Sequence, residues 1–320
     1  MTAFPHFEPK GVIPATLLAL DEDCGIDEAA SRRHLADCAL IDGVAAVTVN
    51  GHASEVHACT FEEQQRILAF SLDEVGDRVP VISGIYADGS HEAARIARMM
   101  ASEGACCLLV FPPQSLGMGL VERPETVIGH FKRIADATDL PLIAFRYPAA
   151  SGLAYGFDTL LSLFEAVPTV RAIKDWCNDP MLHERHIRTF QSLPRKVNVL
   201  TTHSAWLMAS LAMGANGLLS GAGSVIANLQ VALFRAIQAD DLAEARQLND
   251  RIYPLVQAFY TAPFGDMHNR MKEALVMLGR LDKAVVRPPL AKLNDAELMR
   301  LRAALTQVGL LTEESAQQVA

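Results

Sequence analysis

The run Val170-Arg171-Ala172-Ile173-Lys174 is a short apolar segment that ends in an amine. Its composition indicates a buried strand, so Lys174 is expected at the carboxyl end of that strand. Burial lowers the pKa of a lysine from its ordinary value near ~10.4 and frees the lone pair to attack a carbonyl. Lys174 is therefore a candidate catalytic residue, and the alternative is a rim lysine that reaches solvent or pairs with Asp175. The other six lysines are expected where solvent reaches them easily: positions 10, 132, 196, 272, 283 and 292.

Seven more segments of this kind flank the run, at intervals of roughly 25 to 35 residues, and each precedes a helical pattern. Strands that alternate with helices predict an α/β protein with a parallel sheet. Eight such units predict a (β/α)8 TIM barrel, in which catalytic groups lie at the carboxyl ends of the strands. The predicted strands are Gly11–Thr16, Val44–Asn50, Val79–Gly84, Ala105–Phe111, Leu140–Tyr147, Val170–Lys174, Val197–Thr201 and Gly217–Ser220.

Helix signals support this register. Thr60 and Glu63 have the capping-box spacing, which predicts a helix start at that point. After the eighth strand the alternation stops, and the remaining segments are helical over about 223–239, 241–260, 265–280 and 294–308. We therefore predict a catalytic barrel over residues 8–238 and a C-terminal helical extension over 239–312.

Composition narrows the classes of function. Half of the residues are hydrophobic, and the formal net charge is −9. An acidic chain without basic runs does not offer a surface for nucleic acid. The longest apolar stretches fall short of the ~18 residues that a membrane span needs, and the opening residues lack a secretory pattern. We expect a cytoplasmic enzyme whose partner is a small molecule.

Cysteines and histidines give no metal-binding pattern. The six cysteines show no paired C-x-x-C spacing and are expected to be buried reduced thiols. For Cys177, which closely follows Lys174, the alternative is a reactive thiol near a pocket. His183 and His186 lack the spacing and third ligand of a zinc site, so they are expected on the solvated face of an outer helix. No phosphate-binding loop or dinucleotide fingerprint is present, and we expect no metal and no organic cofactor.

Three other strand ends carry candidate binding groups. After the second strand, the sequence Gly51-His52-Ala53-Ser54 offers backbone N–H groups and a hydroxyl to a 2-oxo acid carboxylate, and the alternative is a tight turn capped by Ser54. After the eighth, Ser220 and Gly221 permit a close backbone approach at a helix start that favours an anion, or they form only a compact turn. His203 follows the seventh strand, either as a pocket wall or as a helix-start residue.

Taken together, these stretches resemble the dihydrodipicolinate synthase / N-acetylneuraminate lyase family of class I, Schiff-base-forming aldolases, over roughly residues 8 to 310. The resemblance implies that Lys174 forms the imine and that Gly51–Ser54 takes the place of the family's Gly-Thr-Thr-Gly carboxylate loop. It also implies a homo-oligomer, a tetramer. The matching stretches include Gly11-Val12-Ile13-Pro14-Ala15, Arg78-Val79-Pro80-Val81-Ile82-Ser83-Gly84, Ala172-Ile173-Lys174-Asp175 and Val286-Arg287-Pro288-Pro289-Leu290.

The fifth strand departs from the family. The family ends this strand in Tyr-Asn-x-Pro, whose tyrosine moves protons, whereas this chain has Phe145-Arg146-Tyr147-Pro148. Phe145 has no proton to move, so it becomes a pocket-wall candidate. Imine chemistry still needs an acid or base, which contributes roughly 10²–10⁴-fold. Tyr147 is expected to take that role because strand residues two apart share a face; the other candidates are Ser54, His52 and His203.

His52 and Arg146 each keep two interpretations. His52 is either a base near neutral pH or a donor to the substrate carboxylate. The Arg146 guanidinium either binds a second carboxylate or a polar tail of the substrate, or turns outward to pair with an acidic helix residue. After the fourth strand, Pro112-Pro113-Gln114 stands where the family has an aromatic pair, which argues against dihydrodipicolinate synthase itself.

The sequence therefore predicts a lyase in which Lys174 forms an imine with a 2-oxo acid. A protonated imine withdraws electrons from the adjacent carbons, so either cleavage of a carbon–carbon bond or loss of water can follow. Aldol cleavage or condensation of pyruvate-type substrates is the first hypothesis, and dehydration of a 2-keto-3-deoxy sugar acid is the second. A third, favoured by Phe145 but opposed by Lys174, is a non-catalytic sensor that binds a keto acid.

Overall fold

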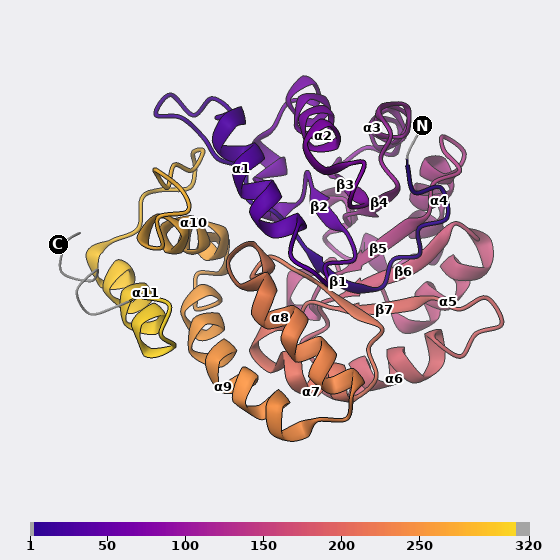
Figure 1. The fold of residues 1–320 in the computed structure, drawn as a ribbon. Coiled ribbons are helices and arrows are strands. Elements are labelled where there is room, and N and C mark those ends of the chain that lie inside the picture. Colours follow the sequence, from indigo (N-terminus) through magenta and orange to yellow (C-terminus); the bar gives the residue numbers. More distant parts are fainter. Residues whose placement is uncertain (1–2, 312–320) are drawn as a thin grey trace.

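The computed structural model describes residues 3–311, and its centre is a ring of eight parallel strands. Neighbouring strands pair in the order β1-β8-β7-β6-β5-β4-β3-β2. Isolated bridges between Val12 and Val44 and between Ala15 and Thr48 join β1 to β2. This confirms the predicted (β/α)8 barrel (Figure 1). The strands are β1 Gly11–Pro14, β2 Val47–Val49, β3 Val81–Ile85, β4 Cys107–Val110, β5 Leu142–Arg146, β6 Val170–Asp175, β7 Asn198–Thr201 and β8 Gly217–Ser220.

The strand β2 is shorter than its predicted range. It ends before Asn50, whose backbone φ of 52° lies in the left-handed region. Asn is one of the few residues that tolerate this conformation. The Asn50 side chain donates to the carbonyl of Gln64 at 2.9 Å and to the Ser83 hydroxyl at 3.1 Å, which fixes the turn. The chain therefore leaves the barrel here and enters the 3-10 turn His52–Ser54.

Eight helices surround the ring (Figure 1). The predicted capping box is present at the start of α2, where Thr60 and Glu63 satisfy each other's backbone N–H groups. The apolar faces of these helices bury the outer face of the strands, as the amphipathic pattern requires. The helices are α1 Glu28–Ala39, α2 Phe61–Val75, α3 Ser90–Glu103, α4 Pro124–Ala135, α5 Phe157–Ala166, α6 Pro180–Phe190, α7 Leu207–Ala212 and α8 Gly223–Gln238.

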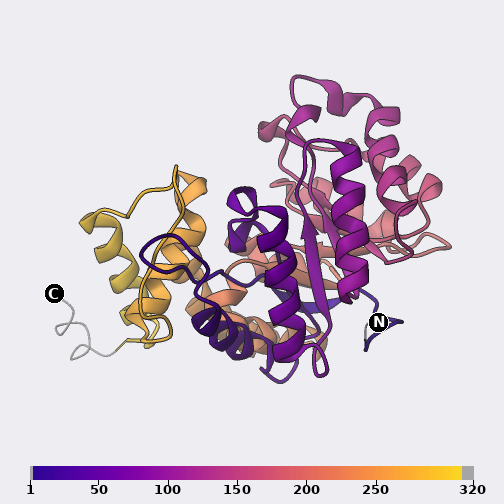
Figure 2. The ribbon, with the colours of Figure 1, turned by 90° about the horizontal axis from the view of Figure 1, so that it is seen from above.

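Three more helices follow α8 and lie on one side of the barrel (Figures 1 and 2). They are α9 Leu242–Phe259, α10 Met267–Met277 and α11 Asp295–Gln307. These helices occur where the sequence predicts the extension, although the last residue of the predicted range, Thr312, lies outside the described residues. No helix in residues 3–311 is long and apolar enough to cross a membrane.

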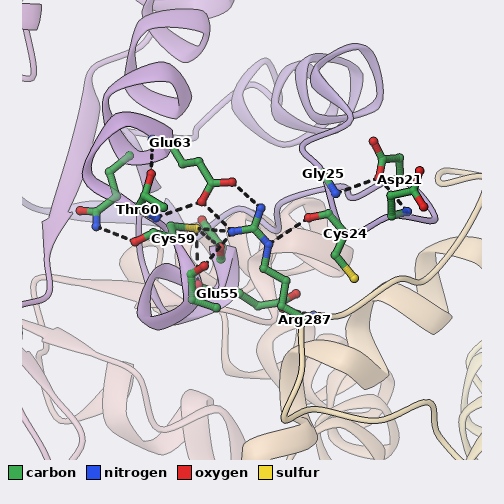
Figure 3. A network of polar contacts seen from close by, with 12 residues as sticks. Asp21, Cys24, Gly25, Glu55, Cys59, Thr60, Glu63 and Arg287 are labelled. Carbon is green, nitrogen blue, oxygen red and sulfur yellow. Dashed lines mark hydrogen bonds and ion pairs between the residues drawn. The ribbon is translucent and has the colours of Figure 1, made fainter.

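A polar network ties the extension to the loop after β2 (Figure 3). The guanidinium of Arg287 donates to Glu63 at 2.7 Å and to the carbonyls of Ala58 at 2.7 Å and Cys24 at 3.1 Å. The backbone N–H of Arg287 donates to the Glu55 carboxylate at 2.8 Å. Arg287 therefore fixes the segment that follows the 3-10 turn His52–Ser54.

Lys272 on α10 completes this network from the buried side. Its ammonium pairs with Glu55 and donates to the carbonyl of Val285 at 2.7 Å. The Lys272 side chain is 1% exposed and that of Glu55 is 2% exposed. The expectation that solvent reaches every lysine other than Lys174 is therefore wrong for Lys272. Its charge is accommodated because a carboxylate and a carbonyl replace the water that it loses on burial.

Candidate active site

One cavity of ≈ 250 Å³ lies at the carboxyl ends of the strands, between the barrel and the extension. Its position agrees with the general rule for (β/α)8 enzymes. Barrel strands and the loops that follow them form one wall, and α9, α10 and their connection form the other. The lining residues are His52, Phe145, Lys174, Trp176, Asn178, Thr202, His203, Ser204, Ala205, Trp206, Gly221, Val256, Gln257, Tyr260, Thr261, Phe264, Met267 and His268.

Lys174 on β6 reaches this cavity and is 7% exposed. Its ammonium nitrogen lies 4.1 Å from the centre of the Phe145 ring on the neighbouring strand. Burial lowers the pKa of Lys174 to about 7, because the charged form loses its hydration. Asp175 is not its partner: that side chain turns to the other face of the sheet and binds His183 and His186. The amine is thus held in the cavity with its lone pair accessible near neutral pH.

His52 brings a titratable ring to the same cavity. The His52 Nε2 atom is hydrogen-bonded to the hydroxyl of Tyr147, and the His52 ring lies 4.6 Å from that of Phe111, centre to centre. Burial, helped by the nearby Lys174, lowers the pKa of His52 to about 3, so the imidazole is neutral. Burial also raises the pKa of Tyr147 far above its usual range. Tyr147 therefore keeps its proton and can donate to Nε2, which leaves Nδ1 of His52 for another partner.

The predicted acid/base candidates are therefore separated by their positions. Tyr147 does not line the cavity itself, and its hydroxyl reaches it only through His52. The Ser54 hydroxyl donates to the carbonyl of Thr16 at 2.8 Å, so it is turned toward β1. His203 lines the cavity, and its Nδ1 lies 3.2 Å from the Thr201 hydroxyl. Of these four residues, His52 and His203 line the cavity, but both ring nitrogens of His203 are engaged, by the Thr201 hydroxyl and the Asn178 backbone N–H.

The remaining predicted binding residues divide in the same way. Phe145 and Gly221 line the cavity, whereas Gly51 and Ala53 do not. Ser220 is buried beneath the lining, where its hydroxyl accepts from Gln230 at 3.1 Å.

Arg146 lies behind the cavity wall. Its side chain is buried on the helix side of β5, and its Nη1 donates to the carbonyl of Tyr147 at 3.1 Å. Within residues 3–311 no ion pair joins Arg146 to a carboxylate, so the predicted partner on an acidic helix is absent. Its guanidinium does not line the cavity either. Of the two interpretations of Arg146, substrate binding finds no support because the residue does not line the cavity; strand alternation turns the side chain outward, but into a packed layer and not to the surface.

His183 and His186 are a clear correction. Both side chains are 0% exposed, and the Nδ1 of each lies 2.7 Å from Oδ2 of Asp175. The prediction of a solvated helix face is wrong because their side of α6 packs against the barrel, where the buried Asp175 carboxylate provides the partner.

Cys177 is 5% exposed, and burial raises the pKa of its thiol to about 12, so it is not a reactive thiolate.

Much of the cavity wall was missed by sequence reasoning. Trp176 and Asn178 lie two and four residues after Lys174, but nothing in their local pattern distinguishes them. The charged helical stretch from Asp266 to Glu273 carries no catalytic pattern in the sequence, yet Met267 and His268 line the cavity. A contact between α10 and strand ends far away in the sequence leaves no local motif. The apolar pattern of a helix shows that one face is covered but not what covers it.

The electrostatics of the cavity are simple. Among the described lining residues, Lys174 is the only lysine or arginine, and no aspartate or glutamate is present. Burial lowers the pKa of His52 and His203 to about 3 and that of His268 well below its ordinary value, so all three rings are neutral. The cavity can therefore hold one anionic group near Lys174, and it offers no second cation.

A buried amine at the end of a strand, in a cavity of a (β/α)8 barrel, is the arrangement of a barrel enzyme. The active site of such an enzyme lies at the carboxyl ends of the strands. The sequence model of the Dihydrodipicolinate synthetase family matches residues 8–308. The chain belongs to this family, as its sequence resemblance implied.

Individual relatives agree. The 4-hydroxy-tetrahydrodipicolinate synthase of Gluconacetobacter diazotrophicus is 30% identical over 94% of this chain and 98% of its own. An uncharacterised DapA-like lyase of Halobacterium salinarum is 29% identical over 94% of each chain. A prophage protein of the dihydrodipicolinic acid synthase family from E. coli K12, solved in complex with pyruvate, has a TM-score of 0.87 at 23% identity. That likeness covers 95% of this chain and 99% of the other, and it shows the fold.

Proposed function

We propose that this protein is a class I lyase that forms an imine between Lys174 and a 2-oxo acid and catalyses aldol cleavage or condensation. Membership of the family supports a lyase. The observation that carries the imine is the position of Lys174, the one lysine in the described cavity lining, in a place where burial favours the neutral amine.

In the proposed reaction the Lys174 nitrogen attacks the C2 carbonyl of the oxo acid. The carbinolamine takes up one proton, loses its hydroxyl as water and becomes a protonated imine. The imine then takes up the electron pair of the breaking C3–C4 bond, while the C4 hydroxyl loses its proton and an aldehyde leaves. Protonation of the enamine at C3 and hydrolysis of the imine return the lysine.

We propose that His52 and Tyr147 together replace the missing tyrosine hydroxyl at Phe145. The supporting observation is the hydrogen bond between the Tyr147 hydroxyl and Nε2 of His52, which lines the cavity with Lys174. A hydroxyl can both donate and accept, so it can serve either tautomer of the neutral ring. The free ring nitrogen can then give a proton to the substrate or take one from it, and the burial of Tyr147 disfavours a free phenolate.

The substrate class follows from the lining. Lys174 uses the single cationic position, so a second carboxylate on the substrate has no partner in the described cavity. This supports a function other than the dihydrodipicolinate synthase reaction. Asn178, Thr202, Gln257 and Thr261 offer uncharged hydrogen-bonding groups for a hydroxylated tail. The same groups favour the second candidate, dehydration of a 2-keto-3-deoxy sugar acid, in which a carbon–oxygen bond breaks in place of C3–C4.

Further parts of the proposal concern organisation. We propose that residues 8–238 form the catalytic barrel and 239–312 the extension, and that the protein is a homotetramer, as its family resemblance implies. The six cysteines are all free, which supports a reducing compartment such as the cytoplasm. Light scattering after size exclusion tests the assembly, and a monomer at micromolar concentration would contradict it.

The experiment that tests the imine is borohydride trapping. The protein is incubated with pyruvate and with a panel of 2-keto-3-deoxy sugar acids, reduced, digested and examined by peptide mass spectrometry. We expect one adduct, on Lys174, and none after Lys174→Met. Lys132→Met is the matched control because Lys132 is exposed, and this variant should still trap. An adduct on another lysine, or none with any oxo acid, overturns the mechanism. An adduct on Lys174 without turnover of any substrate would favour the keto-acid sensor.

A further inference from the structure

A second cluster of chemically active side chains lies directly behind the cavity wall. Along the end of β6, Lys174 and Trp176 face the cavity, while Asp175 and Cys177 face the helix layer. His183 on α6 and His203 after β7 close around them. One ligand atom from each of Asp175, Cys177, His183 and His203 lies within 4.8 Å of all the others, and all four residues are buried.

The spacing in this cluster can be compared with that of a tetrahedral metal site. Bonds of 2.0–2.3 Å to nitrogen, oxygen and sulfur place two ligand atoms about 3.3–3.8 Å apart. The Cys177 Sγ atom lies 3.6 Å from Nε2 of His203. Nδ1 of His183 lies 2.7 Å from Oδ2 of Asp175, so these two atoms would separate slightly to admit an ion.

The outer contacts match as well. In a metal-binding histidine, the ring nitrogen that does not bind the metal usually forms a hydrogen bond, which fixes the orientation of the ring. Here Nε2 of His183 lies 2.7 Å from the Ser210 hydroxyl. Nδ1 of His203 lies 3.2 Å from the Thr201 hydroxyl. The Asp175 carboxylate is held by His186 at 2.7 Å.

We propose that Asp175, Cys177, His183 and His203 bind one divalent transition-metal ion, with zinc as the best match. A mixed set of thiolate, imidazole and carboxylate in tetrahedral array is typical of this ion. Binding breaks the Cys177 S–H bond: the thiol proton leaves to solvent and the sulfur pair goes to the metal. His183 binds through Nδ1 as the tautomer protonated at Nε2, so the Nδ1–H bond to Asp175 is lost and Nε2–H donates to the Ser210 hydroxyl. His203 Nε2 gives up its hydrogen bond from the Asn178 backbone N–H, 3.1 Å away.

The proposed site is structural. Four protein ligands fill a tetrahedral ion and leave no position for substrate, so the metal acts by fixing its ligands. Two of these ligands, Asp175 and Cys177, flank Trp176 and follow Lys174, so the ion would hold the segment that carries the amine. His203 and Asn178 also line the cavity, which gives the ion a path of entry. The inference goes beyond the lyase function, and it stands without it.

Metal content and sulfur ligation test the proposal on the full chain. The protein is produced in zinc-supplemented medium, dialysed, and analysed by mass spectrometry for metals. We expect about one zinc per chain, and X-ray absorption of the wild-type protein should show one sulfur at about 2.3 Å with lighter neighbours. Cobalt(II) added to chelator-treated protein should give the visible bands of a tetrahedral ion and a thiolate charge-transfer band.

Variants assign the ligands. Cys177→Ser should remove the charge-transfer band, and His183→Gln should lower the zinc content at least tenfold. Cys24→Ser and His130→Gln are matched controls outside the cluster and should change neither. Lys174→Met should lose the imine adduct and keep the metal, which separates this proposal from the lyase function. Folded wild-type protein with less than a tenth of a zinc per chain and no cobalt–thiolate band would show a hydrogen-bonded cluster only, and would overturn the proposal. The X-ray absorption measurement uses the wild-type protein, so it tests the metal site even if a variant folds poorly.

Discussion

The buried pair of Lys272 and Glu55 makes a quantitative prediction about the extension. Removal of one partner leaves the other charge buried without compensation, which costs about 3–5 kcal/mol. The upper half of that range applies to Glu55→Gln, because the Lys272 side chain is 1% exposed and keeps only the carbonyl of Val285. Lys272→Met costs less, since the Glu55 carboxylate retains the backbone N–H of Arg287 at 2.8 Å.

The double variant Glu55→Gln/Lys272→Met leaves no buried charge at this point. Replacement of a buried pair by uncharged groups of similar size is often nearly neutral, so the double variant should be more stable than Glu55→Gln alone. The free energies of unfolding come from urea titrations followed by circular dichroism at one fixed protein concentration. Lys283 and Glu22 form an exposed pair, with side chains 40% and 85% exposed, and serve as the matched control. Each single change in that pair should cost about 0–1 kcal/mol.

Two outcomes would refute this reasoning. If Glu55→Gln costs no more than Glu22→Gln, the Lys272 charge is not desolvated as its position requires. If the cost of the double variant is the sum of the two single costs, the two side chains do not act as a pair.

Three further predictions concern the cavity. Tyr147→Phe should lower the turnover number about 10²–10⁴-fold, because the acid/base group loses its hydroxyl. The double variant Tyr147→Phe/Phe145→Tyr should restore part of that loss. A double variant no faster than Tyr147→Phe would contradict the role of the Tyr147–His52 pair. In metal-free protein, imine formation with pyruvate should rise as the pH increases through about 7 and then level off, because only the neutral Lys174 amine attacks; trapping rates that rise up to pH 10 would show an ordinary lysine. In condensation with pyruvate, wild-type protein should prefer an uncharged hydroxyaldehyde over one that bears a carboxylate. Thr261→Arg should reduce the difference in kcat/KM between the two aldehydes, because it supplies a second cation. Equal kcat/KM for the two aldehydes in the wild type would contradict the inference that the cavity holds one anionic group.

The barrel could be predicted from the sequence because each of its units is encoded locally. Buried parallel strands are short apolar runs, and β8 has the bounds that its run predicts, Gly217–Ser220. The end of a strand is harder to predict where a single residue determines it. The strand β2 ends before Asn50 because the backbone of Asn50 adopts a left-handed conformation. The capping box at Thr60 was predictable because its two hydrogen bonds lie within one helical turn.

The candidate site was only half predictable, for the same physical reason. Lys174 and His52 lie at strand ends, which the barrel geometry brings to one face. The other wall comes from residues such as Tyr260 and His268, whose approach to the strands depends on how α9 and α10 pack. His183 is likewise buried because its ring forms a hydrogen bond with Asp175 on the outer face of β6. No spacing in the sequence predicts that contact.

The helices that close the cavity, α9 and α10, are made after the barrel strands. A ribosome completes all eight strands before it has added α9 and α10, so a nascent barrel leaves the Lys174 side of the cavity open to water. In that state we expect the amine to keep its hydration and a pKa near that of a free lysine, so that it is protonated and unreactive toward oxo acids at neutral pH. Packing of α9 and α10 against the strand ends therefore contributes to the burial that makes this lysine a nucleophile.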